Sequence, residues 1–273
     1  MATLREIKRR IRSINSTAKV THAMELVAAA KMRKSQEAAL SGKPYFNSLN
    51  EIIAEIKYKL EVLSHPLLAP KEADKQLIVL LTSDRGLVGG LNINLFREIA
   101  KAQIKNAKYI VVGKKGLSFV TKTASELSAS FVSDKESALD LSRTLTKLII
   151  DAYLNQEVNS VKILYPDFLS IIKQVPTLSQ ILPIEFAQTP AAIPKGTQTH
   201  LTLFEPSADE ILQNLLPHYV LTRIYQAILE AKASEHSSRM VAMKNATDAA
   251  NDLVDDLTLT YNQARQEAVT REL

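Results

Sequence analysis

The sequence predicts an α/β protein in which long helices at the two ends of the chain form an antiparallel coiled coil around an inserted, doubly wound α/β domain. The first observation is that residues 1–41 and 218–273 contain neither glycine nor proline and are rich in residues that favour helices. The second is that short apolar runs alternate with helical patterns between them. We expect an N-terminal coiled-coil helix at 1–60, a Rossmann-like α/β domain at 75–205 and a C-terminal coiled-coil helix at 208–273.

Each terminal segment carries a stripe of apolar residues at alternating steps of three and four, which is the spacing of a left-handed coiled coil. At the N-terminus the stripe is Leu4, Ile7, Ile11, Ile14 and Ala18. At the C-terminus it is Met240, Met243, Thr247, Ala250, Val254, Leu257, Tyr261, Ala264 and Ala268. We call these two stripes the seam. Its many small side chains allow the helices to approach closely but bury little apolar surface.

The middle of the chain is predicted to alternate between strands and helices. Gly42 and Pro44 predict a kink, after which a helical pattern resumes as far as Leu60 and ends at His65-Pro66. Strands are predicted at 76–82, 109–112 and 160–165, with further strands at 170–175 and 200–204. Helices are predicted at 91–104, after Gly113–Gly116, and at 135–155.

The composition limits the classes of partner. The chain has 273 residues and a net charge of +5. Because it contains no cysteine, it has no thiol chemistry or disulfide framework, which fits a reducing cytoplasm. Residues 1–43 hold ten Lys or Arg against three Glu, whereas residues 218–273 hold six basic and eight acidic residues. The basic helix could complement the acidic one or face an acidic protein partner. Nucleic acid is disfavoured, because no DNA-binding motif or aromatic stacking pattern is present.

Neither membrane insertion nor catalysis is indicated. No run of 18 apolar residues exists, and the first ten residues lack the apolar core of a secretion signal. The loop Gly86–Gly90 follows a strand and opens a helix, but it matches neither the dinucleotide nor the P-loop fingerprint, so a structural turn with positive φ is favoured. The five histidines are scattered, and Ser237 and Ser238 beside His236 form no nucleophile motif. We expect no catalytic residue, no cofactor and no metal.

Four segments are similar to the gamma subunit family of F-type ATP synthases. They are TAKVTHAMELVAAAKMR at 17–33, SDRGLVGGLN at 83–92, SEHSSRMVAMKNATD at 234–248 and YNQARQ at 261–266. The family usually has Cys where this chain has Val88. After Thr270–Leu273 it normally continues with a small apolar tail in the bearing of the catalytic ring, and this sequence stops there.

The resemblance implies a non-catalytic rotor shaft that couples proton flow through the membrane sector to ATP synthesis or hydrolysis. The implied partners are the alpha and beta subunits of the catalytic ring, the epsilon subunit and the membrane c-ring. The implied location is peripheral, on the cytoplasmic face of the bacterial plasma membrane, without direct membrane insertion.

The resemblance also implies contact residues for the beta subunit. Arg265 and Gln266 match the pair that catches a loop of that subunit, and Met24 and Arg239 lie where the shaft passes the lower part of the ring. The residues themselves leave two other readings open, namely a nucleotide-binding α/β enzyme with a coiled-coil arm and a free-standing coiled-coil scaffold. Nucleotide titration separates the enzyme from the rotor, and co-purification with a hexameric ATPase ring separates the scaffold.

Overall fold

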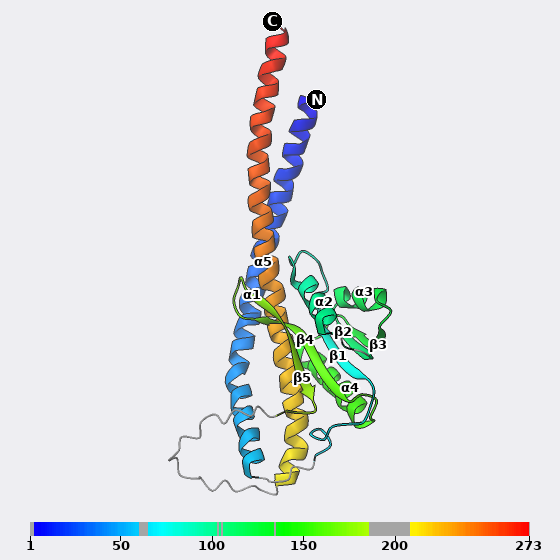
Figure 1. Cartoon of the computed structure of the whole chain (residues 1–273). Helices are drawn as coiled ribbons and strands as arrows, with labels where there is room; N and C mark the ends of the chain where they lie inside the picture. The colour runs from blue at the N-terminus through cyan, green and yellow to red at the C-terminus, as the bar shows by residue number, and fades with distance from the viewer. Residues whose placement is uncertain are drawn as a thin grey trace.

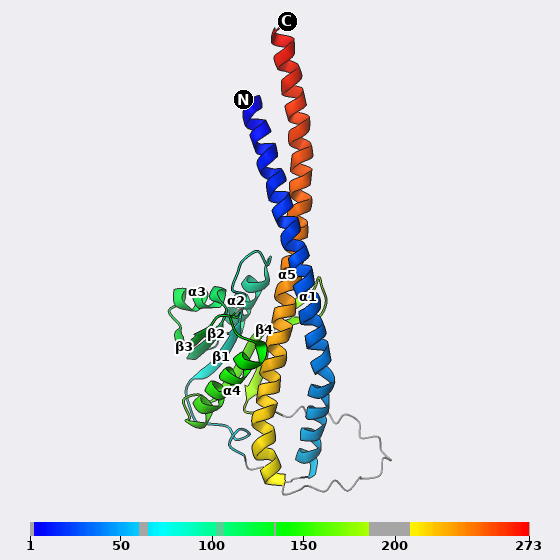
Figure 2. The same cartoon turned by 180° about the vertical axis from the view of Figure 1, so that it is seen from behind.

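Two long helices form an antiparallel pair, and an α/β domain lies against one side of it (Figures 1 and 2). This computed structural model describes residues 3–59, 65–102, 104, 106–133, 135–185 and 208–272. Helix α1 spans Leu4–Lys59 and helix α5 spans Ala208–Glu272, and the C-terminal end of α5 projects beyond the N-terminus of α1 (Figure 1). The predicted fold class is confirmed. None of the described helices is long and apolar enough to cross a membrane.

The seam lies where the sequence predicts it. The hydroxyl oxygens of Thr21 and Thr247 are 2.7 Å apart across the two helices, which fixes their antiparallel register. Ala18, three residues before Thr21, and Ala250, three residues after Thr247, are both buried. Every other seam residue is buried or partly buried. The acidic residues Asp248, Asp252, Asp255 and Asp256 are exposed, and no ion pair joins them to α1 within the described residues. They therefore form a solvated face of α5.

Helix α1 runs through Pro44 without interruption, so the kink predicted near Gly42 and Pro44 does not divide it into two helices. A proline removes one helix hydrogen bond, and contacts with α5 on both sides of it keep the helix in place. The Gln226 side-chain amide donates to the Ala39 carbonyl over 3.3 Å, and the rings of Phe46 and Tyr219 stack with centroids 6.2 Å apart. Helix α5 likewise continues through Pro217. Tertiary packing thus outweighs the local cost of each proline.

The sheet has five strands in the order β3-β2-β1-β4-β5. Strands β1, β2, β3 and β4 are parallel, and β5 pairs antiparallel with β4. Their bounds are Gln76–Leu81, Ala107–Val112, Glu126–Phe131, Ser160–Phe168 and Gln174–Leu182. Helices α2, α3 and α4 span Leu91–Ala102, Lys114–Lys122 and Ala138–Leu154. The strand expected at 200–204 lies outside the described residues.

Three strand predictions need correction. Strand β3 is not predicted at all, because it is an edge strand whose side chains are mostly exposed and lack an apolar pattern. Strand β4 continues through Pro166, since its pairing with β1 ends at Leu164 and a missing N–H beyond that point breaks no bond to β1. The strand expected at 170–175 begins only at Gln174, because residues 170–173 form the turn of the β4–β5 hairpin.

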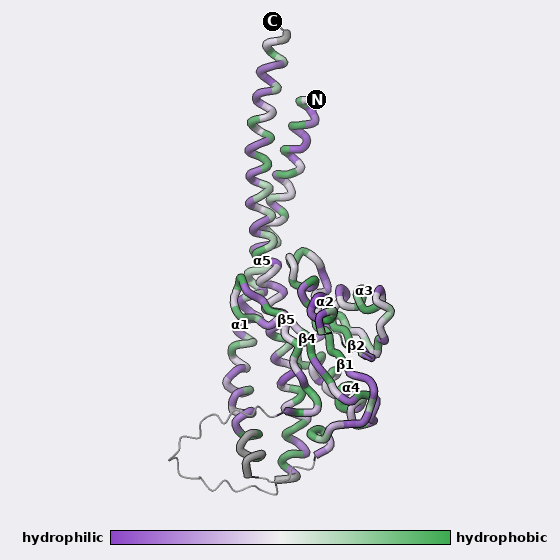
Figure 3. Tube along the Cα trace, in the orientation of Figure 1, coloured by the Kyte–Doolittle hydropathy of each residue, from purple (hydrophilic) through white to green (hydrophobic). Residues whose placement is uncertain are grey.

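The core lies on both faces of the sheet. In β1, Leu77, Val79 and Leu81 pack into a large cluster with α4, α5 and the lower part of α1. Ile78 and Leu80 point to the other face, into a smaller cluster that α2 and α3 complete. In Figure 3 the tube through β1, β2 and β4 accordingly contains long green stretches. The sheet is thus covered by helices on both faces, as expected for a doubly wound domain.

One buried side chain on α5 lacks a partner. The hydroxyl of Ser234 is fully buried and has no hydrogen-bond partner among the described atoms. Because an unsatisfied buried hydroxyl carries its desolvation cost, we expect Ser234→Ala to raise the free energy of unfolding by about 1 kcal/mol. Urea denaturation of the purified chain measures it. Ser237→Ala should lower stability, since Ser237 makes a hydrogen bond, and helix propensity changes equally in both variants. A loss of stability in Ser234→Ala would contradict the assignment.

Candidate partner-contact surface

Two of the four implied contact residues line one cavity. Helix α1, the loop after β1 and helix α5 together enclose a half-open space of about 440 Å³. Met24 reaches it from α1 and Arg239 from α5, while Arg85, Gly86 and Leu87 close it from the loop. The chain folds this way because the seam places α1 beside α5 and the loop lies at the carboxyl edge of the sheet. We call this the Met24–Arg239 surface.

The rim of this surface is apolar and exposed. Val20 is 59% exposed, Val27 57% and Leu87 59%, although all three are large hydrophobic residues. Met24 lies partly buried in the cavity that they border. Leu87 has a φ of 62°, in the left-handed region that non-glycine residues rarely adopt. Sequence reasoning missed Leu87, since only the structure shows that the turn directs it toward α1. An unbranched methionine among exposed apolar residues suits an adaptable contact.

Arg239 is less available than the sequence suggests. One of its terminal nitrogens donates to the Glu235 carboxylate over 2.7 Å, and another lies 3.4 Å from the His236 ring. The Arg239 side chain is 12% exposed and that of Glu235 14% exposed. Helical spacing of four residues brings this pair together on one face of α5. The guanidinium is therefore held in place by its own helix, and only a small part of the side chain is exposed at the cavity.

Arg265 and Gln266 lie far from the other two residues. Both are exposed near the C-terminal end of α5, and Arg265 makes no ion pair within the described part of the chain. From Arg239 to Arg265 the helix rises about 39 Å at the standard rise per residue. The four implied contact residues thus form two separate places, one beside the α/β domain and one near the tip of the coiled coil.

The loop after β1 is a structural turn. The Asn92 side chain donates to the Ser83 hydroxyl over 2.8 Å and accepts from the Ser83 backbone N–H over 3.2 Å. The Ser83 hydroxyl in turn donates to the Arg85 carbonyl over 2.7 Å. Gly89 has a φ of +54°, which agrees with the positive φ expected of this loop. These contacts hold the loop rigidly at the edge of the Met24–Arg239 surface.

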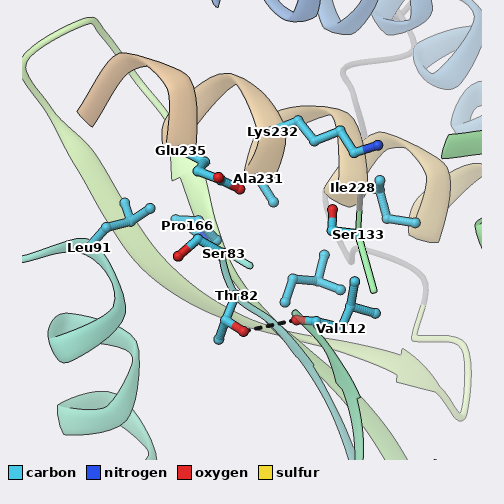
Figure 4. A pocket seen from close by; sticks show the side chains of 11 residues that line it. Thr82, Ser83, Leu91, Val112, Ser133, Pro166, Ile228, Ala231, Lys232 and Glu235 are labelled. Atoms are coloured by element: carbon cyan, nitrogen blue, oxygen red, sulfur yellow. Dashed lines mark hydrogen bonds between the residues drawn. The ribbon is translucent and has the colours of Figure 1, made fainter. Parts of the chain in front are cut away.

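The position where a doubly wound sheet usually binds ligands is occupied by α5. Such ligands bind at the carboxyl ends of the strands, where the strand order reverses, here between β1 and β4. Figure 4 shows Ser83 and Pro166 from these strand ends facing Ile228, Ala231 and Glu235 of α5. The space left is about 20 Å³, which is room for one water molecule. Among the described residues, no group of His, Asp or Glu is placed to hold a metal ion.

A second cavity of about 340 Å³ lies between α1, α5 and the β4–β5 pair. Arg223 donates to the Ser179 hydroxyl over 2.6 Å, and Gln226 donates to the Glu230 carboxylate over 2.8 Å. Burial raises the pKa of Glu230 and, more strongly, that of Tyr165. These groups satisfy one another between the helix pair and the sheet, so the cavity has a structural explanation.

The whole chain matches known sequences. Residues 3–273 match the family described as ATP synthase. The chain is 40% identical to the ATP synthase gamma chain of Opitutus terrae and 42% identical to that of Dehalococcoides mccartyi strain BAV1. Each alignment covers 100% of this chain and 96% of the relative. The chain belongs to the ATP synthase gamma chain family.

Solved structures share this fold. A rotor chain of the Euglena gracilis mitochondrial ATP synthase has a TM-score of 0.67 at 18% identity, covering 97% of this chain and 98% of that one. A central-stalk chain of the Tetrahymena thermophila enzyme has a TM-score of 0.62 at 23% identity, covering 83% and 99%. Family membership makes this chain a subunit of ATP synthase, a membrane-associated complex, and implies a non-catalytic subunit.

Proposed function

We propose that this chain is the rotor shaft of an F-type ATP synthase and couples proton flow to ATP synthesis or hydrolysis by turning. The observation that carries the proposal is the antiparallel pair of α1 and α5, which extends well beyond the α/β domain in a member of the gamma chain family. Helix α5 alone has 65 residues, or about 97 Å at the standard rise. Two helices wound together resist twisting better than one, as a shaft must.

In this proposal, catalysis takes place on the beta subunits, and the shaft acts through contacts that differ around its circumference. The affinity of each catalytic site then depends on the angle of the shaft, and by linkage the angle depends on what each site binds. The proposed partners are the alpha and beta subunits around the coiled coil, and the epsilon subunit and c-ring near the α/β domain. We place the complex on the cytoplasmic face of a bacterial plasma membrane.

We further propose two contact places for the beta subunit. The Met24–Arg239 surface meets the lower part of the ring, and Arg265 with Gln266 engages a loop higher up. A guanidinium presents five donors in a fixed plane and stays charged, so an exposed Arg265 can bind a carboxylate through two hydrogen bonds.

The division into segments 1–60, 75–205 and 208–273 likewise remains a proposal.

Co-purification tests the proposed function. The full chain is expressed with alpha and beta subunits from the same genome, and the assembly is isolated through a tag on beta. We expect this chain in the isolated hexamer and ATP-driven rotation of a probe attached to the α/β domain. An intact hexamer that lacks this chain would refute the shaft assignment. Stoichiometric, tight ATP binding by the isolated chain would instead favour an enzyme.

The two contact places give a prediction for coupling. We expect Arg265→Ala and Met24→Lys to lower proton-driven ATP synthesis by the assembled enzyme several-fold, since one loses a bidentate contact and the other adds a charge to a sliding surface. The melting temperature of the isolated chain should stay nearly unchanged, because both residues are at least partly exposed. Synthesis is measured in reconstituted vesicles and normalised to assembled complex.

The matched control is Arg97→Ala, which removes an exposed arginine from α2, away from both contact places. It should leave synthesis at the rate of the unaltered enzyme. Normal synthesis in Arg265→Ala and Met24→Lys would remove these residues from the path of force without affecting the assignment of the shaft itself.

A further inference from the structure

Two neighbouring serines on α5 hold two different loops of the α/β domain. The Ser238 hydroxyl donates to the Val88 carbonyl in the loop after β1 over 2.7 Å. The Ser237 hydroxyl donates to the Ile171 carbonyl in the turn of the β4–β5 hairpin, also over 2.7 Å. Consecutive residues of a helix point about 100° apart, so adjacent serines reach loops on different sides of α5. We call this pair of contacts the serine latch.

The latch lies beyond the large hydrophobic cluster that joins the domain to α5. The large hydrophobic cluster includes α5 residues up to Ile228, with Ala231 packed at its border. Ser237 and Ser238 lie nearly two turns farther toward the coiled coil. Another side-chain hydrogen bond from α5 to the domain, between Arg223 and Ser179, lies lower, within the level of the cluster. At this level the two serine hydroxyls add hydrogen bonds between the domain and α5, beside the buried side chains of Val88 and Leu91.

Both held loops are built rigidly, so a single contact can position each of them. In the hairpin turn, the Gln174 side chain donates to the carbonyls of Ser170 and Ile171, and Ser170 and Lys173 bond to each other. In the other loop, the Leu91 backbone N–H also donates to the Val88 carbonyl over 3.2 Å. The residue before Val88 is Leu87, which borders the cavity that holds Met24.

We propose that the serine latch makes the upper α/β domain turn as one body with α5 and that Ser238 is the positioning residue that keeps Leu87 beside Met24. This inference rests on the proposed shaft function, because the latch matters only where force passes between the domain and the helix pair. A loop that moved relative to α5 would present Leu87 to the ring at a variable angle. Part of each rotation of the shaft would then move the loop before Leu87 contacted the ring.

Hydrogen exchange of the isolated full chain tests the contact. Ser238→Ala should speed amide exchange about fivefold in residues 84–91 alone, and Ser237→Ala should do so in residues 168–174 alone, as expected for the loss of one hydrogen bond. Ser238→Thr keeps the hydroxyl and should restore slow exchange. Thr258→Ala is the matched control, since its hydroxyl donates within α5 to the Val254 carbonyl. Unchanged exchange in both loops would overturn the latch.

The assembled enzyme tests the positioning role. In reconstituted vesicles, Ser238→Ala should at least halve ATP synthesis at a given proton gradient, and Ser238→Thr should restore it. Faster loop exchange with normal synthesis would overturn the positioning role. If the unaltered chain itself supports no synthesis and enters no complex, the proposed shaft function fails, and the exchange experiment still decides whether the latch exists.

Discussion

Replacement of Gly113 by alanine is expected to lower the free energy of unfolding by about 3 kcal/mol or more. Gly113 joins β2 to α3 with a φ of +98°, and a Cβ atom there would lie 2.1 Å from the Thr82 carbonyl oxygen. Strain from a disallowed backbone region alone costs about 1–3 kcal/mol, and the steric overlap adds to it. Thermal and urea unfolding of the purified chain measure the loss.

The surroundings of Gly113 cannot move aside cheaply. The Thr82 backbone N–H donates to the Val112 carbonyl over 2.8 Å, and the Thr82 hydroxyl donates to the same carbonyl over 2.9 Å. The Gly113 N–H donates to the Phe131 carbonyl over 2.9 Å, so three strands meet at this point. A shift that relieved the overlap would break several of these bonds. The helix–strand junction is thus built for a residue without a side chain.

Gly86 provides the matched control. A Cβ atom at Gly86 would find only the end of the flexible Lys115 side chain at 3.9 Å, and its φ is not in the left-handed region. Gly86→Ala should therefore change stability by no more than about 0.5 kcal/mol. If Gly113→Ala unfolds at the same denaturant concentration as Gly86→Ala, the junction does not have the geometry described.

The fold was largely predictable because its strongest determinants are periodic. The stripe of the seam on α5 repeats over four heptads, and the register seen between Thr21 and Thr247 agrees with it. The central strands were predictable because parallel strands buried on both faces read as continuous apolar runs, as in Gln76–Leu81. Strand β3 carries no such run, since an edge strand needs only one buried side. The strand predicted at 160–165 is longer than expected, because Pro166 lies beyond the last residue of β4 that pairs with β1.

The candidate site was less predictable, because it depends on which segments meet. Similar sequence segments drew attention to Met24 and Arg239, and the structure places both beside one cavity. Nothing in the spacing of residues showed that Leu87 borders this cavity. Nor did it show that the Arg239 guanidinium donates a hydrogen bond to the Glu235 carboxylate. Likewise, Ser237 and Ser238 form no catalytic pattern in sequence, and their contacts with residues 171 and 88 exist only in the folded chain.

Replacement of Ala250 by glutamate is expected to destabilise the helix pair by about 3 kcal/mol. Ala250 is 7% exposed, and the register places it opposite Ala18, which is equally buried. Two alanines at one level let the helices lie close together, so a longer side chain must push them apart or remain buried with an unpaired charge. Either outcome removes seam contacts above and below that level. Thermal unfolding followed by circular dichroism measures the loss.

The same change at Ala264 should cost less, and this difference tests the register rather than helix formation in general. Ala264 is only partly buried, since it lies close to the N-terminal end of α1, where a glutamate can turn its carboxylate into water. Asp256→Ala, on the exposed face of α5, should change stability by no more than about 0.5 kcal/mol. If Ala250→Glu and Asp256→Ala melt together, the stripe through Ala250 does not face α1. That result would contradict a seam in which α1 and α5 pack closely through the small side chains of Ala18 and Ala250.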